Sequence, residues 1–152
     1  MTPKDPKPVI DLIIPAYNEQ QNIVALATAI PKDLFRHIIL IDNNSTDNTP
    51  DLARQQGFMV LHECQRGYGA ACLKGISWLK LQSPPPEMVA FCDADLSDDP
   101  AQLAKLAKPI ARGEAVMVIG SRSKLAQPGS LTFTQRFGNK LACGLIWATT
   151  GK

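Results

Sequence analysis

Two aspartates, Asp93 and Asp95, follow a short apolar run that ends at Cys92. Residues i and i+2 of an extended chain lie on the same side, so the two carboxylates would stand close together. Like charges at that distance repel, and a divalent cation between or beside them removes the repulsion. Oxygen ligands without a nearby His or Cys indicate Mg²⁺ or Mn²⁺, with further ligands from the phosphates of a substrate. The alternative is a solvated turn before a helix that begins near Pro100.

Polar side chains that suit a nucleoside follow two other apolar runs. Asp42 ends one run and precedes a cluster of hydrogen-bonding side chains that includes Asn44. A carboxylate at that buried edge needs a donor partner, such as the N–H of a nucleobase. After the first run, Tyr17 offers a ring that can stack on a base, and Glu19 offers a carboxylate that can accept a hydrogen bond. The alternative for both segments is an ordinary turn that caps the next helix.

The charged residues are distributed unevenly along the chain. There are 16 Lys and Arg against 14 Asp and Glu, and every carboxylate lies at or before Glu114. Arg122 and Arg136 are among the basic groups that follow. Positive groups that face a metal-bound diphosphate stabilise the charge on a departing nucleotide. The alternative is a solvated basic face without a ligand.

Apolar runs rich in Val and Ile alternate with segments of helical period, which predicts an α/β domain with a parallel sheet. Ligands bind such sheets at the carboxyl ends of the strands, where the polar residues above are found. Gly67 and Gly69 match the dinucleotide-binding fingerprint weakly, because Cys72 stands at its third glycine position. The predicted strands are Val9–Ile14, His37–Ile41, Phe58–Leu61, Met88–Cys92 and Ala115–Ile119. The predicted helices lie near Gln20–Ala29, Thr49–Gln56, Gly69–Leu81 and Pro100–Ala111.

The composition excludes several classes of protein. With 45% hydrophobic and 20% charged residues, the chain is globular rather than disordered. Residues 1–8, which are punctuated by Pro and Lys, are predicted to be a flexible tail. They lack the apolar stretch of a secretory signal. No run approaches the ~20 apolar residues that span a bilayer. The four cysteines form no C-x-x-C pair, which indicates reduced thiols in a cytoplasmic protein.

Six segments, taken in order, carry a resemblance to a known family. They are Ile13–Glu19, Ile41–Asp47, Gly67–Ala71, Asp93–Ser97, Gly120–Arg122 and Gln135–Asn139. Together they resemble family 2 glycosyltransferases, and most of all the branch of dolichyl-phosphate mannose synthases and polyprenyl-phosphate sugar transferases. The set is more specific than any one segment, and it includes the D-x-D motif of Asp93 and Asp95. One departure is that Asn43 and Asn44 follow Asp42 where the family often has consecutive acids.

The resemblance implies a GT-A fold, which is a Rossmann-like α/β/α sandwich with a mostly parallel central sheet. It implies a single nucleotide-sugar-binding and catalytic domain over residues 9–152, short at the C-terminus and without the rest of the acceptor part. Carried over by position, the nucleoside would contact Pro15, Tyr17, Glu19 and Asp42, with Asn44 beside them. The metal and diphosphate would be held by Asp93 and Asp95, with Ser97 where some relatives have a Gln ligand. The phosphates of donor or acceptor would be bound by Arg122 and Arg136.

The implied reaction is metal-dependent transfer of a sugar, with inversion, from a UDP- or GDP-sugar to an acceptor. A sugar hydroxyl acceptor would need a general base, whereas a lipid phosphate is already anionic. A base of the family would be expected in the later region, so the lack of a carboxylate after Glu114 favours a phosphate acceptor. The resemblance implies that this acceptor is a polyprenyl phosphate of dolichyl type, with a role in cell-envelope or glycolipid biosynthesis. The alternative is a nucleotide-sugar-binding fragment or pseudoenzyme without a full acceptor site. A sugar-nucleotide pyrophosphorylase is disfavoured, because residues 15–19 lack its glycine-rich signature.

An apolar stripe that includes Phe133 and Phe137 lies on a predicted helix, Gln135–Thr149 and the residues just before it. It suits peripheral contact with the inner face of a membrane, near a lipid acceptor. Packing against the core is the alternative. No nucleic-acid partner is expected.

Overall fold

The computed structural model describes residues 8–120, so Arg122, Arg136 and the predicted helix Gln135–Thr149 lie outside the described residues. The chain divides into two compact units, Met1–Val118 and Ile119–Lys152. The fold of the first unit is an α/β sandwich. The prediction of a single domain over residues 9–152 stays a prediction. Between residues 8 and 120, no helix is long and apolar enough to cross a bilayer.

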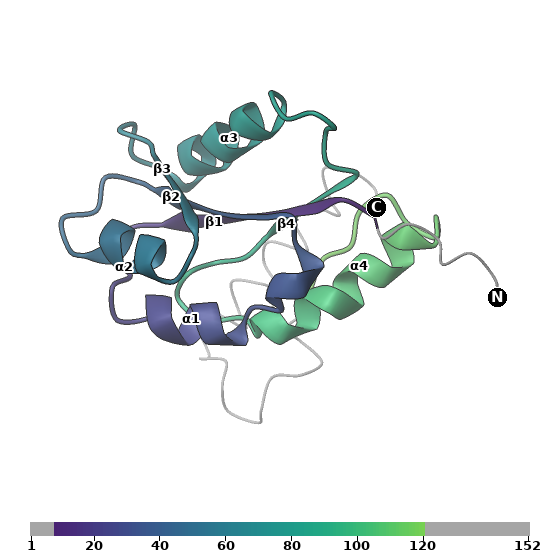
Figure 1. Ribbon diagram of the computed structural model, residues 1–152, viewed down its shortest axis with the longest axis horizontal. Coiled ribbons are helices and arrows are strands. Elements are labelled where there is room, and N and C mark those ends of the chain that lie inside the picture. Colours follow the sequence, from purple (N-terminus) through teal and green to yellow (C-terminus); the bar gives the residue numbers. More distant parts are fainter. Residues whose placement is uncertain (1–7, 121–152) are drawn as a thin grey trace, which may run out of the picture. The chain divides into compact units, whose positions relative to one another are not determined.

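A four-stranded parallel sheet forms the centre of the first unit (Figure 1). Its strands are β1 (Ile10–Ala16), β2 (His37–Asp42), β3 (Met59–His62) and β4 (Met88–Phe91). Their order in space is β3-β2-β1-β4, and Ile13 of β1 lies opposite Ile39 of β2 and Phe91 of β4. β1 is buried along its whole length, because it has a strand on each side and helices on both faces.

Helices cover both faces of the sheet. They are α1 (Ile23–Ala29), α2 (Thr49–Gln55), α3 (Tyr68–Leu79) and α4 (Leu103–Ala111), with the short 3-10 helices η1 (Lys32–Leu34) and η2 (Pro100–Gln102). α1, α2 and α4 lie on one face, and α3 lies on the other (Figure 1). Two parallel strands that lie side by side must be joined by a connection that crosses over the sheet, and this connection is usually a helix. The alternation therefore confirms the α/β/α sandwich that the sequence predicts.

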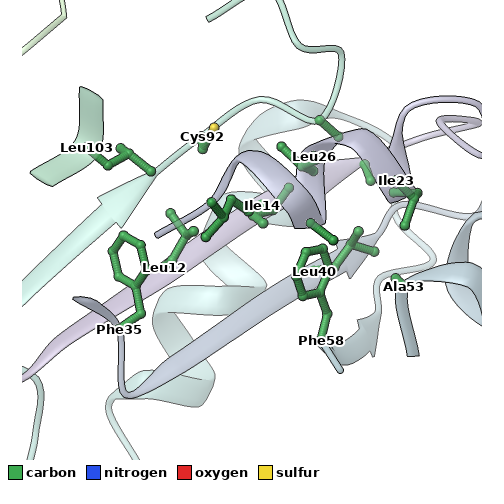
Figure 2. Packing of buried hydrophobic residues seen from close by; sticks show 14 of the residues in the cluster. Leu12, Ile14, Ile23, Leu26, Phe35, Leu40, Ala53, Phe58, Cys92 and Leu103 are labelled. Carbon is green, nitrogen blue, oxygen red and sulfur yellow. The ribbon is translucent and has the colours of Figure 1, made fainter. Parts of the chain in front are cut away.

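The side chains of β1 alternate between two apolar clusters. Leu12 and Ile14 pack with Leu26 and its neighbours on the face that α1 covers (Figure 2). Ile13 belongs to the cluster beneath α3 on the opposite face. A Cβ atom at Gly75 of α3 would lie 2.9 Å from carbons of the Ile13 side chain. The close approach of α3 to the sheet therefore requires a glycine at this position.

An ion pair with a buried carboxylate lies toward the start of β1, away from the carboxyl ends of the strands. Asp11 is fully buried, and Arg36 donates to both of its carboxylate oxygens, with Nε at 3.1 Å from Oδ1. The backbone N–H of His37 donates to the same Oδ1 at 3.1 Å. Arg36 Nη1 also donates to the Pro84 carbonyl at 2.7 Å. Because a buried carboxylate is tolerated when it is paired and hydrogen-bonded, this network accounts for an acid inside the sheet.

The predicted fifth strand, Ala115–Ile119, is wrong. These residues form no strand, and Val116 is fully exposed. A strand needs a hydrogen-bonded neighbour, and no strand of the described sheet pairs with this segment. The other strands and helices predicted within residues 8–120 are confirmed with shifted ends: β1 runs to Ala16 rather than Ile14, and α1 begins at Ile23 rather than Gln20.

Candidate functional site

A cavity of about 290 Å³ lies where β1 and β4 end and α3 begins. This is the edge of a parallel sheet at which ligands bind, because the chain leaves the sheet there and helix N-termini point outward. Its lining residues are Pro15, Ala16, Tyr17, Glu19, Asn43, Tyr68, Ala71, Asp93, Ala94 and Asp95.

The cavity gathers most of the described residues that the sequence predicts for the site. Those that line it are Pro15, Tyr17, Glu19, Asp93 and Asp95. Those that are described but do not line it are Asp42, Asn44 and Ser97. The ring predicted to stack on a base and the carboxylates predicted to bind a metal therefore meet in one cavity, although they are more than 70 residues apart in the sequence.

The two aspartates of the D-x-D motif differ in their surroundings. Asp93 is half-buried, and the Tyr68 hydroxyl of α3 donates a hydrogen bond to its carboxylate. Burial and this hydrogen bond together raise the pKa of Tyr68 well above its usual range, so the hydroxyl stays protonated at neutral pH. Asp95 is exposed, and its Oδ1 accepts the backbone N–H of Ser97 at 2.9 Å. Ser97 thus closes the turn that carries Asp95.

The donor set of the cavity fits a hard divalent cation. Asp93 and Asp95 bring carboxylate oxygens to it, which is the ligand type that Mg²⁺ and Mn²⁺ prefer. Among residues 8–120, no group of three or more His, Cys, Asp and Glu side chains could hold an ion. A cation at Asp93 and Asp95 would therefore need further oxygens from a bound substrate, as Mg²⁺ sites that include phosphates have.

Asp42 has its hydrogen-bond donors within the protein. It is 5% exposed, its Oδ1 accepts the Ser45 N–H at 3.2 Å, and its Oδ2 lies 3.1 Å from Nδ1 of His62. The sequence predicts a hydrogen-bond donor for this carboxylate, such as a nucleobase. Ser45 and His62 already supply hydrogen-bond partners for Asp42, so its burial does not require a nucleobase. Contact between Asp42 and a nucleoside stays a prediction.

The loops that follow β1 and β2 are fastened to each other by side chains. Asn18, whose φ is 56°, accepts the Thr46 N–H on its Oδ1 at 2.8 Å and donates its own N–H to Ser45 Oγ at 3.0 Å. Further hydrogen bonds run from Glu19 N–H to Thr49 Oγ1 (2.8 Å), from Gln20 N–H to Asp47 Oδ2 (3.2 Å) and from Asn48 N–H to Gln20 Oε1 (3.1 Å). Both loops are therefore formed before any ligand binds.

Asp47 is one of the side chains that join the loops after β1 and β2, and it does so as a carboxylate anion. Burial works against its charge, but hydrogen bonds from the Thr49 hydroxyl and backbone and from Gln20 outweigh that cost and lower the pKa of Asp47. Asp47 Oδ1 accepts the Thr49 N–H at 3.0 Å just before α2, whose N-cap residue is Asn48.

Asn43 is a cavity residue to which the sequence motifs assign no role. It is 7% exposed. Its Nδ2 donates to the carbonyls of Glu63 (3.1 Å) and Gln65 (2.7 Å), and its Oδ1 accepts the Gly67 N–H at 2.7 Å. Asn43 therefore ties the end of β2 to the loop between β3 and α3. Because Asn43 follows β2 directly, the sequence predicts that it lies near the site. Nothing in the sequence distinguishes Asn43 from Asn44 in this respect.

That loop places a cation against Tyr17, one of the residues that line the cavity. The guanidinium carbon of Arg66 lies 4.6 Å from the centre of the Tyr17 ring, within the range of a cation–π contact. Tyr17 lines the cavity and remains 42% exposed. Arg66 was also missed by the sequence analysis, because a contact between loops 49 residues apart has no local signature.

The family model of glycosyl transferase family 2 matches residues 11–141 of the chain. The chain belongs to this family. The match covers all of β1 but its first residue and extends through every other described element. The resemblance found in the sequence motifs is therefore confirmed.

Curated relatives include enzymes of polyprenyl-phosphate sugar transfer. An uncharacterized glycosyltransferase of Mycobacterium tuberculosis (strain H37Rv) is 36% identical over 77% of the chain and 50% of its own length. The UDP-N-acetylglucosamine–dolichyl-phosphate N-acetylglucosaminyltransferase of Methanococcus voltae is 27% identical over 86% of the chain and 59% of its length. The undecaprenyl-phosphate 4-deoxy-4-formamido-L-arabinose transferase of Serratia proteamaculans is 32% identical over 77% of the chain and 38% of its length. The chain thus spans about half the length of these relatives.

A similar solved structure identifies the fold. Glucosyl-3-phosphoglycerate synthase from Mycobacterium tuberculosis, crystallised with Mn²⁺, UDP-glucose and phosphoglyceric acid, superposes with a TM-score of 0.60 at 25% identity. The similarity covers 70% of this chain and 40% of that one. The fold of this family 2 chain is GT-A, as the sequence motifs imply.

Proposed function

We propose that the chain is the donor-binding and catalytic part of an inverting, metal-dependent glycosyltransferase. It would transfer a sugar from a UDP- or GDP-sugar to a polyprenyl phosphate of dolichyl type. The observation that carries this proposal is that Asp93 and Asp95 line the same cavity as Tyr17 and Glu19. Family membership and relatives named for dolichyl and undecaprenyl phosphate support it.

The cavity has a nucleoside end and a diphosphate end under this proposal. Tyr17 would stack on the base and Glu19 would accept a hydrogen bond from the nucleoside. Asp93 and Asp95 would hold Mg²⁺ or Mn²⁺, and the bound cation would supply the positive charge that stabilises the leaving nucleoside diphosphate. Arg122 and Arg136, which lie outside the described residues, are assigned from the sequence to the phosphates.

The charge of the cavity makes metal dependence a physical expectation. Three carboxylates line it, from Glu19, Asp93 and Asp95, and the lining contains no Lys or Arg among the described residues. A diphosphate would be repelled by these carboxylates at contact distance. A divalent cation between the two sets of oxygens turns that repulsion into attraction, so donor binding should depend on metal.

A phosphate acceptor would need no general base in this site. A phosphate oxygen can attack the anomeric carbon from the face opposite the leaving group, and no proton has to be removed from it. The new bond to the sugar forms as the bond to the nucleoside diphosphate breaks, which inverts the configuration. A lipid acceptor would bring the protein to the cytoplasmic face of a membrane as a peripheral protein.

The second candidate is a nucleotide-sugar-binding protein without turnover. It would need only the donor side of the cavity, to which Tyr17, Glu19, Asp93 and Asp95 are assigned. Such a protein would keep metal-dependent donor binding at Asp93 and Asp95 but would lack the rest of an acceptor site.

Calorimetry with UDP, GDP and their sugars, with and without Mn²⁺, is the first test. It is followed by turnover assays with polyprenyl phosphate and with free sugars as acceptors. Asp93→Asn should abolish metal-dependent binding, whereas Asp51→Asn, an equal charge change on exposed α2, should not. Metal-dependent binding with transfer to polyprenyl phosphate supports the proposal. Binding without turnover supports the second candidate, and no binding of any of these nucleotides rejects both.

A further inference from the structure

We propose that Asn43 is a positioning residue for the nucleoside end of the cavity. Its side-chain amide holds residues 63–67 so that the Arg66 guanidinium stays over the Tyr17 ring. The inference rests on the proposed function only for its ligand, a nucleoside diphosphate.

The hydrogen bonds of Asn43 fix the orientation of its amide. Backbone carbonyls only accept, so the atom facing Glu63 O and Gln65 O must be the NH₂ group. The Gly67 N–H only donates, so the atom facing it must be the amide oxygen. An aspartate would offer no donors here, and its carboxylate would face two carbonyl oxygens.

The anchored residues lie on both sides of Arg66. Gln65 is held through its carbonyl and Gly67 through its N–H, so the backbone of Arg66 has little freedom. Gly67 has φ 133°, a conformation that residues with a Cβ rarely adopt. The loop geometry that puts Arg66 over Tyr17 is therefore set jointly by Asn43 and Gly67.

Arg66 gives this end of the cavity two properties. It restrains the exposed Tyr17 ring through the 4.6 Å cation–π contact, and it adds positive charge beside a lining that holds three carboxylates. A ring and a cation that are ordered in advance need not be immobilised when the nucleotide binds. Loss of the amide should therefore weaken nucleotide binding through Arg66, with the rest of the cavity intact.

The test compares Asn43→Asp with Asn48→Asp. Both make the same chemical change, and Asn48 is exposed, caps α2 with no side-chain hydrogen bond and does not line the cavity. We expect N43D to speed hydrogen exchange at Gly67 and to weaken UDP or GDP binding with Mn²⁺ by about fivefold, because the loop must then be ordered on binding. N48D should leave both measurements within about twofold of the wild type.

A double-mutant cycle with Arg66→Gln separates positioning from general destabilisation. If Asn43 acts through Arg66, N43D has its full effect in the wild type and less than about twofold further effect in R66Q. Equal losses in both backgrounds, or unchanged affinity in N43D, would overturn the proposal. If N43D does not fold, Asn43→Ser is measured in the same two backgrounds. If the wild type binds neither nucleotide, the proposed function fails. In that case, unchanged hydrogen exchange at Gly67 in N43D would also reject the proposal that Asn43 holds residues 63–67 in place.

Discussion

The Tyr68 hydroxyl donates to the Asp93 carboxylate, and both side chains line one cavity although Tyr68 begins α3 and Asp93 follows β4. The hydrogen bond orients the carboxylate before any ligand arrives. Partners of this kind fix the direction in which a ligand oxygen points and are part of a metal site.

Replacing Tyr68 by Phe removes that hydrogen bond and keeps the ring. We expect the affinity for Mn²⁺ in the presence of UDP to fall by about tenfold, the lower limit for lost partners of metal ligands. Electron paramagnetic resonance of free Mn²⁺ measures it, with Asp93→Asn as the reference for complete loss. Unchanged affinity would show that Tyr68 does not orient Asp93.

The buried Asp11 predicts a large stability effect far from the cavity. Asp11→Asn removes the charge of a fully buried carboxylate that pairs with the partly exposed Arg36, and we expect a loss of about 1–3 kcal/mol in the free energy of unfolding. Asp51→Asn removes an exposed pair with Arg54 and should cost less than about 1 kcal/mol. Urea unfolding measures both, and equal losses would contradict the assignment of Asp11 as a buried anchor.

Gly75 predicts an overpacking effect beneath α3. Gly75→Ala would favour the helix by up to about 1 kcal/mol on propensity alone. We expect instead a net loss of about 1–3 kcal/mol, because the added methyl group meets Ile13 inside a packed cluster. Thermal unfolding measures the loss, and Ile13→Val in the same chain should recover part of it. A rise in Tm for the single variant would contradict the close contact.

The cysteines should differ sharply in reactivity. Burial, with a contribution from nearby aspartates, raises the pKa of the Cys92 thiol to about 11, so about one part in a thousand is thiolate at pH 8. Cys64 is exposed. Iodoacetamide at pH 8 should label Cys64 and spare Cys92, and Cys92 labelling should increase as the pH rises toward 11 or when urea unfolds the chain. Peptide mass spectrometry measures both sites, and similar labelling of the two at pH 8 in the folded chain would refute the prediction.

The residues after β1 and β4 could be located from sequence because strand period and the geometry of parallel sheets place them. Tyr17, Glu19, Asp93 and Asp95 follow directly from those rules, and all of them line the cavity. The segment Ala115–Ile119 shows the opposite case. Its composition suits a strand, but pairing depends on which neighbour is within reach, and local composition carries no such information.

The contacts between loops could not be predicted from the sequence either, because they also depend on which segments come within reach of each other. Asn43 and Asn44 are the same residue type, and only the backbone decides which of them turns inward. Asn44 has φ 65° and is exposed, whereas Asn43 is buried against the next loop. Once Asn43 holds that loop, the contact between Arg66 and Tyr17 follows.

The hydrogen bonds that join the loops after β1 and β2 come from side chains outside the cavity lining, chiefly those of Asn18, Asp47 and Thr49. The residues that would recognise a ligand, Tyr17 and Glu19, occupy different positions in the same loops. Scaffold and recognition are therefore separable for the protein engineer. A combinatorial library that varies Tyr17 and Glu19 and keeps the three fastening residues can search for altered donor selectivity without dismantling the loops that present it.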